Sequence, residues 1–391
     1  MTRIAILGGG TAALPVALQM GDLARAEDRV TVIADGAKFR AGPPAPWLAP
    51  RAAKRKAIEF EIAPALAKKG IVFSAAGAKR VHPERNQVEL GDGTSLDYDF
   101  LVIAAGPRPA FDEVEGLGPE GFTQSICHVD HLSRCERAWK RLIARPGPIV
   151  VGAVQGATCL APAYESAFRM DAELRRQGLR ERSPMTFVTP EPFVGDLGVG
   201  GLEDSRAKLE AELRARDIGW ITGAAVLRVQ RGRMHLIERE GTNRPGRARS
   251  LPFRYALMMP AFRGIDAIRG IEGLVDERGF VLVDEYHRNP KYGNIYAAGV
   301  TIAAPPGKPA SAAGARAVPC LLESMAENVA SNIRDQIDGK APACKGTWRP
   351  VRLVDRGGSG LAFAADQGCA PRLDRGAWVH MTQCSCCDVA R

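Results

Sequence analysis

The sequence predicts an α/β protein made of two tandem Rossmann-like dinucleotide-binding units and a short C-terminal segment. The first unit is an apolar strand, residues 2–7, that runs into a glycine-rich turn and then a helix. The second is a similar strand, residues 148–151, followed again by glycines and by a helix from about residue 162. A further strand, residues 294–298, also ends in small residues and glycine. Strands that alternate with helices in this way indicate parallel sheets.

The first glycine-rich turn carries the pattern Gly-x-Gly-x-x-Ala at residues 8–13. Gly8 allows a tight turn, Gly10 lets the backbone approach a pyrophosphate, and the small Ala13 lets the helix pack on the strand. The helix N-terminus offers unpaired N–H groups and the positive end of its dipole to phosphates. A second strand, residues 28–34, completes a βαβ unit, and Asp35 follows where an acid would hold a ribose hydroxyl. The sequence therefore predicts a dinucleotide site.

Other elements follow from periodicity and turn residues. We expect an amphipathic helix around residues 58–69, a hairpin that turns at residues 91–93, and a buried strand, residues 96–105, that ends at Gly106. After the second glycine-rich turn we expect a strand at residues 185–188 and a helix at 204–216. A last helix, at about residues 317–337, follows Gly299.

The composition narrows the class of protein. The chain has 391 residues, 46% apolar and 25% charged, as expected for a soluble protein of two or three domains. No apolar run approaches the roughly 20 residues that span a bilayer, and the first strand has no secretory leader before it. We therefore expect a cytoplasmic protein whose net charge of +9 suits weak peripheral contact with the inner membrane surface. The basic clusters lack interleaved aromatic residues, so we expect no nucleic acid partner.

Two of the nine cysteines stand in specific contexts. Cys127 ends the segment Gln-Ser-Ile-Cys, and Cys159 ends Ala-Thr-Cys, with Pro-Ala-Tyr-Glu following at residues 162–165. In a cytoplasmic protein, so many cysteines argue for redox or metal chemistry rather than a disulfide framework. With these segments the chain resembles the flavoprotein disulfide reductases and, more narrowly, the sulfide:quinone oxidoreductase family. The resemblance extends to His380, through residues 46–47, 106–107, 146–152, 279–284, 296–299 and 323–325.

The resemblance implies an enzyme that oxidises sulfide, or a related persulfide or thiol, and passes electrons through FAD to a quinone-like acceptor. Cys159 is implied as the flavin-proximal nucleophile, and its place just before a helix N-terminus favours the thiolate. Cys127 is implied as an accessory thiol, and His131 as a candidate proton carrier near neutral pH. The FAD is expected to be held by Gly8, Gly10, Ala13, Asp35, Gly106 and Gly299.

On this basis the domain organisation is expected to be discontinuous. Residues 1–113 and 272–343 would form the FAD-binding domain, and residues 114–271 the second dinucleotide-fold domain. Residues 344–391 would form a C-terminal segment with a cysteine-rich tail.

Three positions depart from the family pattern. Arg352 stands where the second redox cysteine is expected, Asp196 where a histidine is expected, and Ala317 where a lysine is expected. Arg316 or Arg352 could restore the positive charge near the flavin. Candidates for the missing thiol are Cys127, Cys320 and the tail cysteines. The tail cysteines are Cys384, Cys386 and Cys387. Together with His380 they could also hold a soft metal, but we assign no metal site.

Two alternative functions remain open. The first is an NADH:acceptor oxidoreductase that binds nicotinamide nucleotide at Gly152–Gly156; Gln155 crowds that turn, and no acid precedes Glu191 at the ribose position. The second is a catalytically inactive flavin- or metal-binding sensor, which Arg352 favours. A flavocytochrome-type sulfide dehydrogenase is disfavoured because no leader precedes the first strand. The sulfur donor, the electron acceptor and the oligomeric state stay open, a homo-oligomer included.

Overall fold

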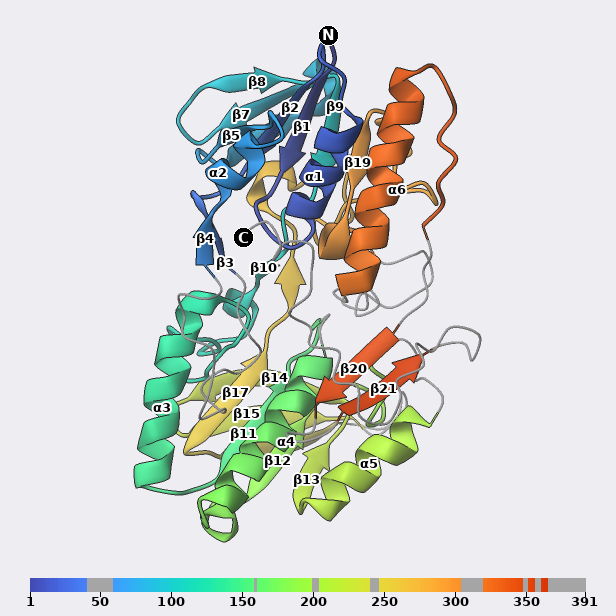
Figure 1. The fold of residues 1–391 in the computed structure, drawn as a ribbon. Helices are drawn as coiled ribbons and strands as arrows, with labels where there is room; N and C mark the ends of the chain where they lie inside the picture. Colours follow the sequence, from blue (N-terminus) through green and yellow to red (C-terminus); the bar gives the residue numbers. More distant parts are fainter. Residues whose placement is uncertain are drawn as a thin grey trace.

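The computed structural model describes residues 1–40, 59–157, 160–198, 204–239, 246–303, 319–346, 351–355 and 360–364. Two parallel sheets with helices on their faces organise these residues into two halves (Figure 1). The α/β class predicted from the sequence is confirmed.

The first half is built on a five-stranded parallel sheet of order β19-β9-β1-β2-β5. Helices α1 (Ala13–Leu23) and α6 (Pro319–Ile337) lie side by side on this sheet (Figure 1). Apolar side chains of the sheet and both helices form one buried core, so late parts of the chain stabilise the first strand. The strands are β1 (Arg3–Leu7), β2 (Arg29–Ile33), β5 (Val72–Ser74), β9 (Phe100–Ile103) and β19 (Ile295–Ala297).

Two small antiparallel sheets flank the first half. One holds β6 (Ala78–His82), β7 (Gln87–Leu90) and β8 (Ser95–Asp97), with the predicted turn between β7 and β8. The other pairs β3 (Lys38–Arg40) with β4 (Glu59–Glu61). The helix expected at residues 58–69 is shortened to α2 (Ile62–Ala67), because residues 59–61 pair as a strand and Phe60 stacks on Phe39 at 4.8 Å.

The second half is built on a four-stranded parallel sheet of order β13-β12-β11-β17. A three-stranded antiparallel sheet of order β14-β15-β16 accompanies it, and α3 (Leu132–Ala144), α4 (Ala161–Arg176) and α5 (Ser205–Ala215) complete it. The strands are β11 (Ile149–Ala153), β12 (Met185–Val188), β13 (Ile218–Ile221), β14 (Ala224–Gln230), β15 (Arg233–Glu238), β16 (Arg247–Pro252) and β17 (Tyr255–Met259).

The chain connects the halves through β10 (Arg108–Pro109) and β18 (Phe262–Arg263), which pair antiparallel. Beyond α6, the hairpin β20 (Val351–Asp355) and β21 (Gly360–Ala364) returns to the second half and lies against α4 (Figure 1). Short 3-10 turns complete the fold: η3 (Pro83–Arg85), η4 (Phe111–Glu113), η5 (Val129–His131), η6 (Arg180–Arg182), η7 (Asp266–Ile268) and η8 (Gly299–Thr301).

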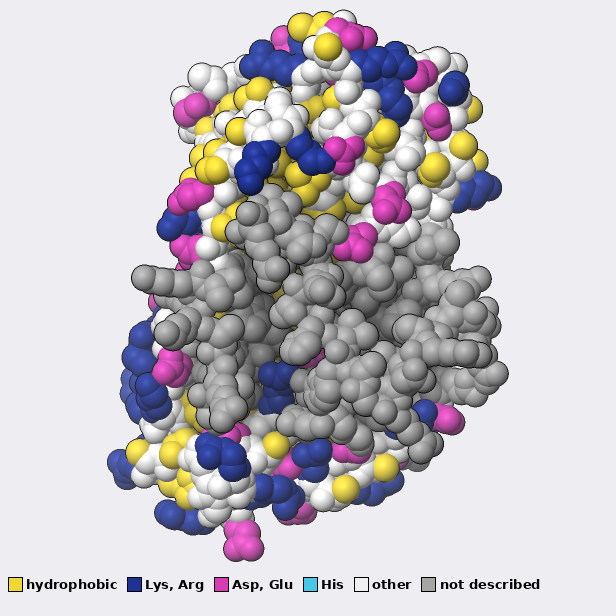
Figure 2. Space-filling model, in the orientation of Figure 1, with side chains coloured by type: hydrophobic (Ala, Val, Ile, Leu, Met, Phe, Trp, Pro, Cys, Tyr) yellow, Lys and Arg dark blue, Asp and Glu magenta, His cyan; other side chains and the backbone are white. Residues whose placement is uncertain are grey.

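Charged side chains of both signs are interspersed over both halves on the face drawn in Figure 2. None of the helices in the described ranges combines the length and the apolar character needed to cross a bilayer.

Candidate active site

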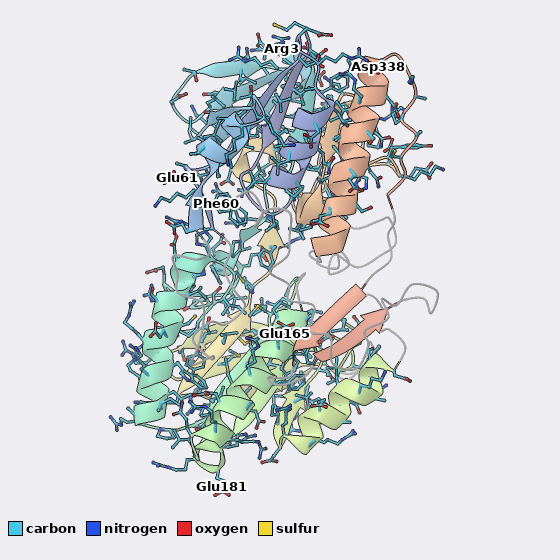
Figure 3. The ribbon with its side chains drawn as sticks, viewed as in Figure 1. Arg3, Phe60, Glu61, Glu165, Glu181 and Asp338 are labelled. Atoms are coloured by element: carbon cyan, nitrogen blue, oxygen red, sulfur yellow. The ribbon has the colours of Figure 1, made fainter. Side chains whose placement is uncertain are left out.

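The six predicted cofactor residues lie at one edge of the five-stranded sheet. Gly8–Ala13 follows β1, Asp35 follows β2, Gly106 follows β9, and Gly299 follows β19. Because these strands are parallel, their carboxyl ends meet at a single edge, where open α/β sheets bind ligands. Figure 3 marks the opposite end of this half with Arg3 and Asp338, so the carboxyl edge faces the second half.

Each glycine of this edge has a distinct steric role. Gly8 has φ +125°, and a Cβ there would lie 2.8 Å from the carbonyl oxygen of Ala104, so only glycine fits the tight turn. A Cβ on Gly299 would lie 2.6 Å from the Cβ of Ala12, which brings β19 close to the start of α1. A Cβ on Gly10 or Gly106 would meet no described atom within 4 Å. Gly10 therefore keeps a surface clear that no described residue covers.

The start of α1 and Asp35 fit a dinucleotide. Ala12 caps α1 without a side-chain hydrogen bond, and the N–H of Leu14 donates to the carbonyl of Gly10 at 3.1 Å. The Asp35 side chain is 92% exposed and its carboxylate lies 3.8 Å from the guanidinium of Arg108. The positive end of the helix dipole suits a pyrophosphate, and an exposed carboxylate suits a ribose hydroxyl.

A cluster around Ser125 holds Cys127 and His131. The buried Ser125 hydroxyl accepts the backbone N–H of Cys127 at 3.1 Å and lies 3.2 Å from Nδ1 of His131. Burial, with help from the neighbouring His128, lowers the pKa of His131, so the ring is mostly neutral near pH 7. Ser125 therefore links the backbone of Cys127 to the ring of His131, while the partly buried side chain of Cys127 packs against the core of the second half.

The third predicted catalytic residue, Cys159, lies outside the described residues. Its described flanks are Ala157 and Leu160, both buried, and α4 begins at Ala161. Arg352 lies on β20, beside α4, and its side chain is not among those described. The side chain of Cys320 and the positions of Arg316, Ala317, His380 and the tail cysteines also lie outside the described part. Cys135 is a buried thiol whose pKa burial raises to about 11, which leaves it protonated and unreactive.

The second glycine-rich turn has different surroundings. Gln155 reaches across to β14, where its amide donates to the carbonyl of Val226 at 3.0 Å and accepts the N–H of Val226 at 2.9 Å. A Cβ on Gly152 would lie 1.8 Å from the carbonyl oxygen of Val188, so this glycine serves the packing of β11 against β12. The side chain of Gln155, although exposed, is therefore bonded to β14 at this turn.

The side chain of Glu191, which follows β12, is buried and hydrogen-bonded within the protein. Its carboxylate accepts hydrogen bonds from the hydroxyls of Tyr164 and Thr189, each at 2.6 Å, and from the N–H of Leu197 at 2.7 Å. Burial raises the pKa of Glu191 to about 7. The sequence identified Glu191 only as a late acid near the ribose position and did not reveal this network, because its partners lie on α4 and in the loop at residues 193–198.

Asp196, at the position of the family's histidine, lies in that same loop and accepts the N–H of Gly198 at 2.9 Å. The Tyr164 hydroxyl accepts the N–H of Gly195 at 3.0 Å, so the loop is tied to α4. Among the described residues, no group of three or more His, Cys, Asp or Glu side chains could hold a metal ion.

Comparison with known proteins places this geometry among flavoenzymes. The family model described as pyridine nucleotide-disulphide oxidoreductase matches residues 2–317. A sulfide-quinone reductase from Aquifex aeolicus is 32% identical over 385 residues, which cover 97% of this chain and 87% of that protein. The mitochondrial sulfide:quinone oxidoreductase of Mus musculus is 21% identical over 80% of this chain and 68% of its own length. The X-ray structure of the Aquifex aeolicus sulfide:quinone oxidoreductase superposes with a TM-score of 0.82 at 30% identity, covering 94% of this chain and 84% of that one.

Proposed function

This chain belongs to the pyridine nucleotide-disulphide oxidoreductase family, and we propose that it is a sulfide:quinone oxidoreductase. In this reaction sulfide loses two electrons and becomes zero-valent sulfur, and a quinone gains two electrons and two protons to become the quinol. A related persulfide or thiol is the alternative donor. The observation that carries the proposal is the contrast between the open first turn and the second turn, where Gln155 is bonded to Val226.

The family implies a flavin, and the residues at the sheet edge fit its dinucleotide form, FAD. Gly10 leaves room for a pyrophosphate, and the start of α1 directs the positive end of its helix dipole toward it. Asp35 is free to bind a ribose hydroxyl because most of its side chain is exposed. When bound, the flavin supplies a two-electron carrier between the sulfur donor and the quinone. We propose that Ala13, Gly106 and Gly299 complete the cofactor site.

The sulfur chemistry is assigned to Cys159, Cys127 and His131. Cys159 is proposed as the flavin-proximal thiolate: sulfide would attack a sulfur–sulfur bond in which Cys159 takes part, a new sulfur–sulfur bond would form to the other sulfur, and Cys159 would leave as the thiolate. A position next to the N-terminus of α4 would favour that thiolate by lowering its pKa. Cys127 is proposed as an accessory thiol, and its backbone is fixed by Ser125. His131 is proposed to serve proton transfer, since its neutral ring is available near pH 7.

The domain and location assignments extend the proposal. We propose that residues 1–113 and 272–343 act as the FAD-binding domain, residues 114–271 as the second domain, and residues 344–391 as the C-terminal segment. A quinone-like acceptor is apolar and resides in the bilayer, so the enzyme has to meet it at the membrane. The net charge of +9 supports peripheral contact with the inner membrane surface from the cytoplasmic side.

The test is an anaerobic titration of the purified flavoprotein with sulfide, followed by a soluble quinone. We expect sulfide to bleach the flavin absorbance and the quinone to restore it. Cys159→Ala should abolish bleaching, whereas the matched control Cys344→Ala should leave it unchanged, because Cys344 lies after α6 and contacts Asn332 rather than the site. Full bleaching in Cys159→Ala would contradict the role assigned to this thiol.

Two other outcomes point to the alternatives. Bleaching by NADH but not by sulfide would identify an NADH:acceptor oxidoreductase. The hydrogen bonds of Gln155 and of the buried Glu191 argue against a nicotinamide nucleotide site at the second turn. Retention of flavin with no reduction by any donor would identify a sensor. The observation that favours the sensor is Arg352, which stands where the family has its second thiol.

A further inference from the structure

We propose that Ser125 is a positioning residue that sets the tautomer of His131, so that the ring presents Nε2–H as its donor. This inference rests on the proposed function, in which Cys127 and His131 take part. Ser125 is fully buried, and its hydroxyl is within hydrogen-bond distance of both the Cys127 backbone and the His131 ring.

Ser125 is itself held by the second half of the protein. The preceding residue, Gln124, forms a parallel bridge to β17: its N–H donates to Ala256 at 2.7 Å, and its carbonyl accepts from Met258 at 3.2 Å. The carbonyl of Ser125 accepts the thiol of Cys135 on α3 at 3.0 Å. The backbone that carries the Ser125 hydroxyl is therefore held in place by β17 and α3. His131 lies at the start of α3.

The tautomer follows from counting protons. The Ser125 oxygen accepts the N–H of Cys127, and it has one proton to donate. In the described residues the acceptor within reach of that proton is Nδ1 of His131 at 3.2 Å. If Nδ1 carried the proton instead, a buried hydroxyl would lose its acceptor, which costs about 1 to 3 kcal/mol. A neutral ring with its proton on Nε2 satisfies all three groups.

The same contact opposes protonation of the ring. An imidazolium has protons on both nitrogens, so Nδ1 would no longer accept from Ser125. Burial and His128 also lower the pKa of His131. Asp130 and Glu120 act in the opposite direction, and Arg134 acts with His128. A neutral His131 therefore presents Nε2–H as its donor, and uptake of a proton at Nδ1 has to break the hydrogen bond from Ser125.

The first test uses NMR of the holoprotein labelled with ¹⁵N-histidine. The chain has six histidines, so the His131 signals can be assigned by their loss in His131→Gln. We expect the Nε2–H tautomer for neutral His131 in the wild-type protein. The Nδ1–H tautomer would overturn the proposal, and this result depends neither on a Ser125 variant that folds nor on activity with sulfide.

The second test compares Ser125→Ala with Ser133→Ala, a matched control on the first turn of α3. Loss of the hydroxyl should raise the apparent pKa of His131 by about 0.5 to 1 unit, a threefold to tenfold change in proton affinity. The pH profile of sulfide-dependent flavin reduction should shift by the same amount in Ser125→Ala and stay in place in Ser133→Ala. If Ser125→Ala lowered the rate of flavin reduction equally at every pH and left the pH profile in place, Ser125 would have only a structural role and the proposal would be overturned.

The two tests separate failure of this inference from failure of the proposed function. If sulfide does not reduce the wild-type flavin, the proposed function is wrong, and the NMR titration still reports whether Ser125 sets the tautomer. If sulfide reduces the flavin but the tautomer or the pH shift is not found, the function stands and the role of Ser125 is wrong.

Discussion

The turn after β1 and the turn after β11 share the same strand–glycine–helix pattern, but the protein surrounds them differently. In the first turn a Cβ on Gly10 would meet no described atom within 4 Å, and the acid that follows the next strand, Asp35, is 92% exposed. In the second turn Gln155 bonds to Val226 in both directions, and the acid after the next strand, Glu191, is buried. At the first turn Gly10 is open and the acid is exposed, whereas at the second the glutamine and the acid are both hydrogen-bonded within the protein.

The comparison shows that a glycine-rich turn after a strand indicates close packing of the backbone and does not by itself indicate a bound nucleotide. Gly8 and Gly152 are required in both turns for the same reason, because a Cβ at either position would collide with the backbone of a neighbouring strand or its extension. That requirement belongs to the packing of the fold and holds with or without a ligand. Whether a nucleotide can bind depends on side chains that arrive from elsewhere, such as Gln155 and Glu191.

The largest expected effect is on folding, from Gly152→Ala. The added Cβ would lie 1.8 Å from the carbonyl oxygen of Val188 and force β11 and β12 apart. We expect the free energy of unfolding to fall by about 3 kcal/mol or more, measured by urea unfolding followed by circular dichroism. Gly219→Ala in β13 is the control, since its Cβ would lie 3.9 Å from the nearest atom. A wild-type midpoint for Gly152→Ala would show that the second turn is not a packing feature.

The next effect concerns the pH dependence of stability at Glu191. Burial raises its pKa to about 7, above the value of about 4.3 expected in the unfolded chain, so the folded protein binds more protons between these values. Stability is therefore lost as the pH rises through this window. From about pH 5 to about pH 8, the unfolding free energy of the wild type should fall by about 2 to 3 kcal/mol relative to Glu191→Gln.

The control for this comparison is Glu181→Gln, which removes an exposed carboxylate on η6 (Figure 3). Its stability should follow the wild-type pH curve. If the Glu191→Gln and wild-type curves run parallel, the carboxylate is not held in the interior as its three hydrogen bonds indicate, and the second ribose position would have to be considered open.

A smaller effect is expected from Gly10→Ala, which tests the open turn. Because the Cβ meets no described atom, the apoprotein should unfold at the wild-type midpoint. The flavin should bind about tenfold more weakly, equivalent to about 1.4 kcal/mol, because the methyl group occupies space that the pyrophosphate needs. Flavin titration of the apoprotein measures this, with Gly293→Ala as the control at another open position. Unchanged affinity would mean that the pyrophosphate does not approach Gly10.

The sequence was sufficient to predict the first site because its parts obey a local rule. Gly8, Gly10, Asp35 and Gly299 each follow a strand of one parallel sheet, so their proximity could be inferred without knowing any side-chain contact. The resemblance, which covers nearly the whole chain up to His380, likewise predicted the family that the comparisons show. The cluster of Cys127 with His131 was predicted only as a pair of nearby positions; Ser125 as their shared partner became visible only in three dimensions.

The state of the second site could not be predicted in this way. Glu191 is bonded to Tyr164, which precedes it by 27 residues, and to the N–H of Leu197, a residue with φ +53°. Gln155 is bonded to Val226, 71 residues away on another sheet. No spacing rule links such positions, because each contact depends on how separate sheets pack. The sequence indicated that Gln155 crowds the turn, and the structure supplies the partner that holds it there.

The smallest expected effect on stability comes from Gln155→Ala. This variant tests which of two features keeps NADH from the second turn, the Gln155 side chain or the lack of an exposed acid for the ribose. The variant loses two hydrogen bonds and leaves the buried backbone of Val226 without its partner, so stability should fall by about 1 kcal/mol. Gln230→Ala on the same strand is the control, because its side chain contacts His235 at an exposed position. NADH should still fail to bleach the flavin in Gln155→Ala, since Glu191 remains bonded to Tyr164 and Thr189 and cannot bind a ribose. Bleaching by NADH in this variant alone would mean that the Gln155 side chain by itself prevents NADH from binding at the second turn. The burial of Glu191 would then not be a reason why NADH fails to bind.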